Sequence, residues 1–343
     1  MKDMNISSKV CSELNFNIKG IEKYISQKNY KEDMIDKVEP CLKEKLKHGY
    51  ILGKNNLKLY YEKFIVENPK ANIVICHGFG ECAEKYYELT YYFIQEGYSV
   101  FIVEHRGHGR SKRLGIDKSQ INVENFNYYV EDFKKFIDEI VIPNGKNKEL
   151  LLFAHSMGGG IGTVFLEEYT DYFKAAILSS PMHEINTGKI SKSLASFISK
   201  SMKLFGMKKR YLPGQTVYTG KKDLEGSATS CRERYEYLYQ KIKENEDYQT
   251  GGSSVLWYLE SLKATRNLVK EENASKVRIP VLLFQTEYDT YVNPEGQNKF
   301  AAHAQNCQLI KIKESKHESY FEKDEIVVSV IEKMLIFYEN NYK

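Results

Sequence analysis

Ser156 stands in the segment Ala154-His155-Ser156-Met157-Gly158, between an apolar run that ends at Phe153 and a helix-like stretch from Gly159 to Tyr169. A serine at the apex of a sharp strand-to-helix turn exposes its Oγ and points the next backbone N–H at a reacting carbonyl. We therefore predict that Ser156 is a nucleophile for acyl transfer. The alternative is an ordinary turn between a strand and a helix that happens to contain a serine.

A serine nucleophile needs a general base, and the base needs an acid that orients it. In a strand-turn-helix arrangement of this kind the three follow in the order serine, acid, histidine. Asp289 follows a late apolar run and is the predicted acid, with Glu287 as the reserve. His317 follows an alternating run near the C-terminus and is the predicted base, because its late competitor, His303, falls inside a helical pattern.

Acyl transfer also requires donors to the oxyanion of the tetrahedral intermediate. The backbone N–H of Met157 supplies one by the geometry of the turn, and the second is expected from a loop after an early strand. The loop His77-Gly78-Phe79-Gly80-Glu81 follows an apolar run that ends at Cys76, and its glycines allow close approach of the backbone. We predict the N–H of Phe79 as the second donor; the alternative is a glycine-bearing turn that binds nothing.

The segment from Glu104 to Ser111 is dense in histidine and arginine, which raises the question of a metal or phosphate site. No cysteine or cluster of carboxylates completes a plausible set of metal ligands with His105 and His108. We interpret the segment as a structural loop and expect neither a metal nor a cofactor.

Short apolar runs and helical patterns alternate along most of the chain. This alternation predicts an α/β fold with a mainly parallel sheet, helices on both faces, and a site at the carboxyl ends of the strands. The predicted strands cover residues 57–66, 72–76, 99–103, 150–154, 175–178, 281–284 and 308–312, and the predicted helices cover 86–95, 124–140, 161–169, 190–205, 295–304 and 326–338.

We expect three regions. Residues 1–48 are polar and rich in lysine and are predicted to form an N-terminal helical extension, while 49–180 and 274–343 form the core. Residues 181–273 lack a comparable buried strand, so we predict a helical cap, where substrate selectivity would be decided. Its basic pieces, 208–210 and 221–222, are either solvated or suited to an anionic lipid surface.

The composition sets the remaining limits. With 42% hydrophobic and 28% charged residues, the 343-residue chain can bury a substantial core, and a net charge of +4 argues against a nucleic-acid partner. No apolar run is long enough to span a bilayer, and the N-terminus leads into no signal-peptide core. The six cysteines lie far apart with no Cys-x-x-Cys pair. We expect a cytoplasmic protein, with peripheral contact to the inner face of the membrane as a further option.

Four motifs together resemble the monoacylglycerol lipase and bacterial lysophospholipase family of α/β-hydrolases, which is related to the serine aminopeptidase S33 hydrolases. The resemblance covers roughly residues 50–340, and its motifs are 77–81, 104–111, 154–159 and 317–324. It implies the same nucleophile, acid, base and oxyanion donors that the residues themselves suggest. Two departures are Ala154, where the family often has glycine, and Thr286, where many members have glycine before the acid.

The resemblance implies a substrate class: the single acyl ester of a lysophospholipid or monoacylglycerol, cleaved beneath a helical cap. Two alternatives stay open at this point, a broad-specificity short-chain carboxylesterase and a non-catalytic ligand-binding member of the fold.

Overall fold

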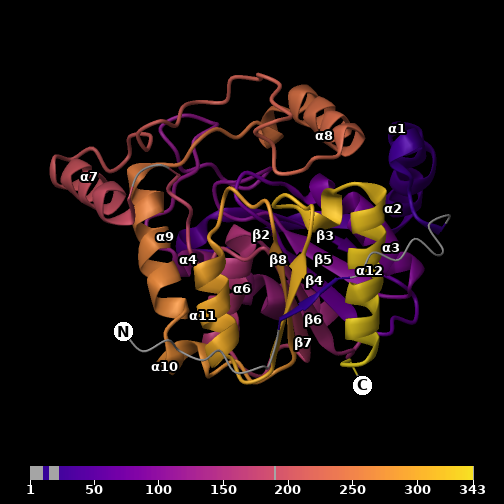
Figure 1. The fold of residues 1–343 in the computed structure, drawn as a ribbon. Helices are drawn as coiled ribbons and strands as arrows, with labels where there is room; N and C mark the ends of the chain where they lie inside the picture. Colours follow the sequence, from indigo (N-terminus) through magenta and orange to yellow (C-terminus); the bar gives the residue numbers. More distant parts are fainter. Residues whose placement is uncertain (1–10, 15–22, 189–190, 343) are drawn as a thin grey trace.

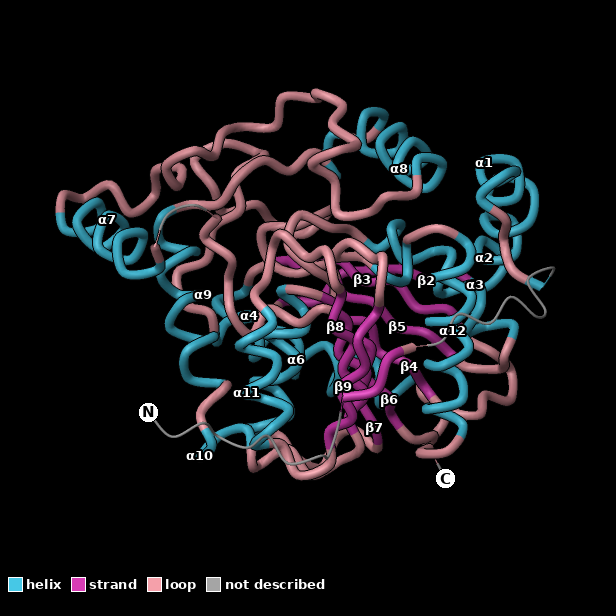
Figure 2. The backbone as a smooth tube through the Cα atoms, in the orientation of Figure 1, coloured by secondary structure: helices cyan, strands magenta, loops and turns pink. Residues whose placement is uncertain are grey.

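The computed structural model describes residues 11–14, 23–188 and 191–342. Their strands form one sheet in the order β1-β9-β8-β7-β6-β4-β5-β3-β2, which runs through the centre of the molecule between two layers of helices (Figures 1 and 2). The strands are β1 Cys11–Glu13, β2 Leu46–Leu52, β3 Lys58–Phe64, β4 Asn72–Cys76, β5 Ser99–Val103, β6 Leu150–His155, β7 Ala175–Ser179, β8 Val281–Thr286 and β9 Cys307–Ile312.

The strand pairs are parallel except at one edge, where β3 runs antiparallel to both β2 and β5. Every residue of the central strands β4 to β8 is buried, which explains why they read as continuous apolar runs rather than alternating ones. The predicted parallel sheet is confirmed. Its carboxyl ends carry Ser156, which follows β6, and the loops after β4, β8 and β9.

The helices cover both faces of the sheet. One core layer packs α4, α6, α9 and α11 on the sheet, and the other packs α1 to α3 and α12 on the opposite face. The helices are α1 Tyr30–Asp33, α2 Glu39–Lys45, α3 Tyr87–Gln95, α4 Asn127–Phe136, α5 Ile142–Asn144, α6 Met157–Glu168, α7 Lys192–Leu204, α8 Arg232–Glu244, α9 Val255–Leu268, α10 Glu271–Ala274, α11 Pro294–His303 and α12 Asp324–Glu339. Single turns of π-helix continue α1 and α4, at Met34–Val38 and Ile137–Val141.

The N-terminal segment differs from the predicted helical extension over residues 1–48. Helices do form between Tyr30 and Lys45, but Cys11–Glu13 pairs in parallel with β9 and Leu46 already begins β2. Both strands lie at sheet edges, where one side faces solvent and the sequence need not be apolar. A strand of three residues is also too short to show a period, so the prediction was wrong at these two places.

The segment predicted as a cap lies above the carboxyl ends of the strands, with α7 and α8 at its two ends (Figure 1). The helix α9 differs in position, because it descends beside α6 and buries Trp257, Tyr258 and Leu262 in the core. The limits of the cap at residues 181 and 273 remain a prediction. Among the described residues, no helix is long and apolar enough to cross a membrane.

Candidate active site

Ser156 occupies a strained backbone position between β6 and α6. Its φ of 51° and ψ of −118° are unusual for a residue with a side chain, and conformations of this kind cost about 1–3 kcal/mol. Hydrogen bonds hold the strained peptide units, since the Ser156 N–H donates to Ser179 O at 3.1 Å and its carbonyl accepts from Met182 N at 2.7 Å. The serine side chain is half-buried at the carboxyl edge of the sheet.

Glycines make the close crossing at this turn possible. A Cβ added at Gly158 would lie 2.0 Å from the carbonyl oxygen of Cys76, so no larger residue fits between α6 and the end of β4. The same comparison explains how Ala154 replaces glycine. A Cβ at Gly162 would lie 3.1 Å from the Ala154 methyl group. The absence of a side chain at Gly162 of α6 therefore leaves room for this methyl group.

The predicted base and acid lie together. His317 Nδ1 is 2.6 Å from Asp289 Oδ2, and both side chains are nearly buried. The other oxygen of Asp289 accepts from the backbone N–H groups of Tyr291 and Val292. Burial alone would raise the pKa of Asp289, but the bond to His317 and these two donors hold it below its ordinary value. Asp289 is therefore ionised and orients the imidazole.

The neighbours of Asp289 answer two open points from the sequence. Thr286 Oγ1 donates to Asp289 Oδ2 at 3.2 Å, so the threonine at the position where many family members have glycine adds a hydrogen bond to the predicted acid. Glu287, the reserve acid, accepts from the backbone of Glu314 instead and does not contact His317.

His317 also lies beside the serine turn. Its ring centroid is 4.8 Å from that of His155, the residue before Ser156, and 5.0 Å from that of Tyr291. This contact joins the loop after β9 to the end of β6.

The loop after β4 has the features expected of an oxyanion site. Gly78 N donates to the Glu81 carboxylate, so this amide already has an acceptor. Gly80 has a φ of +74°, a left-handed conformation that favours glycine. In the described part of the chain, the N–H groups of Phe79 and Met157 donate to no protein acceptor. The Phe79 ring packs edge-on against Trp257 of α9, with centroids 4.6 Å apart.

Sequence reasoning missed a buried polar cluster directly beneath these loops. Lys85 Nζ lies 2.6 Å from Glu81 and also bonds to Glu318, the residue after His317. Glu81 further accepts from the hydroxyl of Tyr86 and lies 3.6 Å from His155 Nε2. The spacing of Glu81 and Lys85, four residues apart, was the available signal, but nothing local pointed to Glu318.

The charges in this cluster are set by burial and by Lys85. Burial raises the pKa of Glu318, whereas Lys85 holds the pKa of Glu81 below its ordinary value despite burial. Burial lowers the pKa of His155 to about 3, so this ring is neutral. Glu81, His155 and Glu318 are spaced closely enough to bind a metal, but the ammonium group of Lys85 already occupies the space between the two carboxylates.

The histidine- and arginine-rich loop, residues 104–111, packs against the loop after β4. His105 N donates to His77 Nε2 at 2.9 Å, and Arg106 forms a buried ion pair with Asp132 at 2.7 Å. Burial lowers the pKa of His105 and of His108. These contacts are all internal, as expected of a structural loop.

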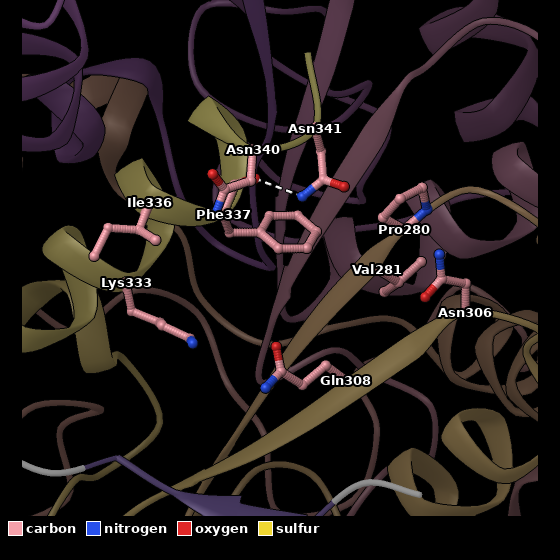
Figure 3. A pocket seen from close by; sticks show the side chains of 9 residues that line it. All are labelled: Pro280, Val281, Asn306, Gln308, Lys333, Ile336, Phe337, Asn340 and Asn341. Carbon is pink, nitrogen blue, oxygen red and sulfur yellow. Dashed lines mark hydrogen bonds between the residues drawn. The ribbon is translucent and has the colours of Figure 1, made fainter. Parts of the chain in front are cut away.

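A cavity of about 270 Å³ lies elsewhere, at the opposite end of the strands (Figure 3). Val281, at the start of β8, and the last turn of α12 border it, far along the strand from the acid that follows β8. Amides and a lysine line much of it, and it does not belong to the candidate site.

The sheet order, the strained serine after β6 and the His317–Asp289 pair after later strands define an α/β-hydrolase fold. A family model described as serine aminopeptidase, S33, matches residues 67–324. The chain belongs to this family of α/β-hydrolases.

Relatives with known names agree with this assignment. The probable lysophospholipase L2 of Haemophilus influenzae is 30% identical over 284 residues, which cover 82% of this chain and 88% of the relative. The monoglyceride lipase homolog of monkeypox virus is 29% identical, covering 80% and 91%. Among solved structures, a soluble variant of monoglyceride lipase from Saccharomyces cerevisiae, in complex with a substrate analog, superimposes with a TM-score of 0.70 at 19% identity, covering 87% and 95%. This last similarity supports the fold.

Proposed function

We propose that this protein is a serine hydrolase that cleaves the single acyl ester of a lysophospholipid or a monoacylglycerol. The observation that carries the proposal is the His317–Asp289 pair beside the strained turn of Ser156. The names of the relatives supply the substrate class, since they include lysophospholipases and monoglyceride lipases.

The reaction proceeds in two acyl-transfer steps. Ser156 Oγ attacks the ester carbonyl while His317 accepts its proton, and His317 then protonates the leaving alcohol. Water hydrolyses the acyl-enzyme by the reverse proton path. Asp289 stays ionised throughout and holds the proton of His317 on Nδ1, which leaves Nε2 free to act as the base.

The oxyanion of each tetrahedral intermediate accepts from the N–H groups of Phe79 and Met157. A preorganised donor of this kind contributes about 3–4 kcal/mol to the transition state. Two features support these donors: their amides have no protein acceptor among the described residues, and Gly78, next to Phe79, is fixed by Glu81.

A lipid substrate also favours peripheral contact with a membrane, most simply the inner face if the protein is cytoplasmic. The ester must leave a bilayer or micelle before it reaches Ser156. The cap segment with its exposed basic residues lies over the same edge of the sheet (Figure 1).

The test is hydrolysis of lysophosphatidylcholine, monoacylglycerols and p-nitrophenyl esters of increasing chain length by the purified protein. Ser156→Ala and His317→Ala are expected to abolish hydrolysis, and Ser156→Ala should abolish labelling by a fluorophosphonate, while the exposed Ser193→Ala on α7 keeps both. Labelling of Ser156→Ala at the wild-type rate contradicts the nucleophile. A preference for the shortest esters would instead support a broad carboxylesterase, and no labelling of the wild-type protein would support a ligand-binding member of the fold.

A further inference from the structure

The helix α7 presents large apolar side chains to solvent. Phe197 is 67% exposed, Leu204 is 84% exposed, and Phe205, which caps the helix, is 75% exposed. The residues that α7 buries are small and polar, namely Ser196 and Ser199. The smaller or more flexible apolar residues Ala195, Ile198 and Met202 are half-buried, so some of the most exposed side chains of α7 are large and apolar, whereas a surface helix usually turns its apolar stripe toward the core.

The exposed residues form one patch. Leu194, Phe197 and Leu204 fall on one face of α7 at 3.6 residues per turn, and Leu194 is also exposed. Phe205 and Met207 continue the patch into the following turn. We call these five residues the α7 patch. Clustered exposure of large apolar side chains marks a contact surface in soluble proteins.

The chain around the α7 patch is strongly basic. Residues 185–222 contain no Asp or Glu, and their cations are Lys189, Lys192, Lys200, Lys203, Lys208, Lys209, Arg210, Lys221 and Lys222. Only Lys192 and Lys222 form ion pairs among the described members of this set, with Glu184 and Glu236. The described cations on either side of the patch, Lys200, Lys203 and Lys208 to Arg210, therefore carry uncompensated positive charge.

An apolar helix face with a basic border fits the interface of an anionic lipid bilayer. Aromatic and leucine side chains enter the boundary between head groups and acyl chains, while lysine and arginine stay at the level of the phosphates. A protein partner would need complementary acidic residues and a shaped surface, whereas a bilayer needs only this separation of apolar and basic groups. The charge therefore favours a lipid surface.

The position of α7 links this surface to the candidate site. The helix lies at the periphery of the molecule and packs against α9, whose Trp257 contacts the ring of Phe79 (Figure 1). Apolar contact with lipid would therefore occur at a helix that reaches the predicted oxyanion loop through one intervening helix, α9.

We propose that the α7 patch docks this protein on anionic membrane surfaces, the source of a lipid substrate. The inference rests on the proposed function for its purpose but not for its test, because binding can be measured without turnover.

The experiment is co-sedimentation of the Ser156→Ala protein with vesicles of phosphatidylcholine alone or of phosphatidylcholine and phosphatidylglycerol in equal amounts. We expect binding to the anionic vesicles that weakens as salt is added. Replacing Phe197 and Phe205 by serine should remove most of this binding. Replacing Lys208, Lys209 and Arg210 by glutamine should weaken it by roughly fivefold for each residue, on the order of 100-fold in total.

Matched controls separate local docking from general charge and hydrophobicity. Lys28, Lys43 and Lys47 are exposed on the N-terminal side of the molecule, and their replacement by glutamine removes the same net charge. Ile336→Ser removes an exposed apolar residue from α12. Both control proteins should bind the anionic vesicles as Ser156→Ala does.

Several results would overturn the proposal. They are failure of the Ser156→Ala protein to bind either vesicle, equal binding by the Phe197 and Phe205 variant, and equal weakening by the control lysines. If the Ser156→Ala protein is a dimer that binds no vesicles, and replacing Phe197 and Phe205 by serine makes it a monomer, the patch is instead a contact between copies of the chain. In the wild-type protein, which retains Ser156, the same patch substitutions should leave hydrolysis of a water-soluble short ester unchanged. If the wild-type protein binds vesicles but hydrolyses no ester, the proposed function is refuted and the docking surface is not.

Discussion

Replacing Lys85 by methionine tests whether the buried cluster holds the candidate site together. The substitution keeps most of the apolar length of the side chain and removes only its ammonium group. That group lies between Glu81 and Glu318, in the loops that carry Phe79 and His317. Its removal leaves two carboxylates close together and away from water.

The expected loss of stability follows from this geometry. Breaking a buried ion pair by removing one partner typically costs 3–5 kcal/mol, because the remaining charge has no compensation. Burial already raises the pKa of Glu318, so this carboxyl group can take up a proton and relieve part of the strain. We therefore expect a loss of about 3 kcal/mol in the free energy of unfolding near neutral pH.

The pH dependence gives the sharper test. In the wild-type protein the pKa of Glu81 is lowered, so its contribution to stability is present above the unfolded pKa of about 4.3 and is lost only in acid. In Lys85→Met both carboxyl groups have raised pKa values, so stability falls as the pH rises through them. The difference between the two proteins should widen from about pH 5 to about pH 8.

Urea unfolding at several pH values measures this difference, with Lys135→Met as the control. Lys135 pairs with Glu139 four residues away on an exposed helix face, where such a pair contributes about 0.5 kcal/mol or less. The rate constant kcat should also fall roughly tenfold, because Glu81 fixes Gly78 beside the proposed oxyanion donor Phe79. This loss is smaller than the loss of about 100-fold or more that follows complete removal of an oxyanion donor, since the donor is only displaced. A difference that narrows with rising pH, or that equals the control, would refute the reasoning.

Three further predictions each concern the surroundings of a single residue. Asp289→Asn should lower kcat on the order of 10⁴-fold with the fold intact, whereas Glu287→Gln should change it little; the reverse result in steady-state assays would identify Glu287 as the acid. Gly158→Ala places a methyl group against a carbonyl of β4 and should cost about 1–3 kcal/mol or more in denaturant unfolding, together with activity. Burial raises the pKa of Glu167 to about 8, so the free energy of unfolding falls as the pH rises from the unfolded pKa of about 4.3 toward 8. Glu167→Gln removes this titration and should raise the free energy of unfolding by roughly 1–3 kcal/mol at about pH 8. No increase would contradict the burial argument.

The central strands were predictable because burial on both faces makes them continuously apolar. The runs at 72–76, 99–103 and 150–154 match β4, β5 and β6 within a residue. The edge strands were not predictable on the same basis. The strand β2 buries only Ile51 fully, so no apolar pattern distinguishes it from the polar segment before it.

The candidate site divides in the same way. Ser156, Asp289 and His317 each follow a strand and have side chains suited to a nucleophile, an acid and a base, so local context was enough to predict these roles. The partners that hold them have no such local signal. Lys85 meets Glu318 across 233 residues of chain, a contact that only the folded structure brings together.

The two ends of the cap segment are held by different forces. At one end, Arg234 of α8 is fully buried and forms ion pairs with Glu88 of α3 and Asp324 of α12. Because both partners belong to core helices, displacing α8 would break these ion pairs and leave the charges of Arg234, Glu88 and Asp324 uncompensated, at a cost of several kcal/mol. At the other end, α7 packs against α9, buries only Ser196 and Ser199 fully, and keeps Phe197 and Leu204 largely in solvent. Little apolar area is lost if α7 moves, so adjustment of the cap to a lipid surface is expected at the α7 end, while α8 keeps its position above the loop of His317.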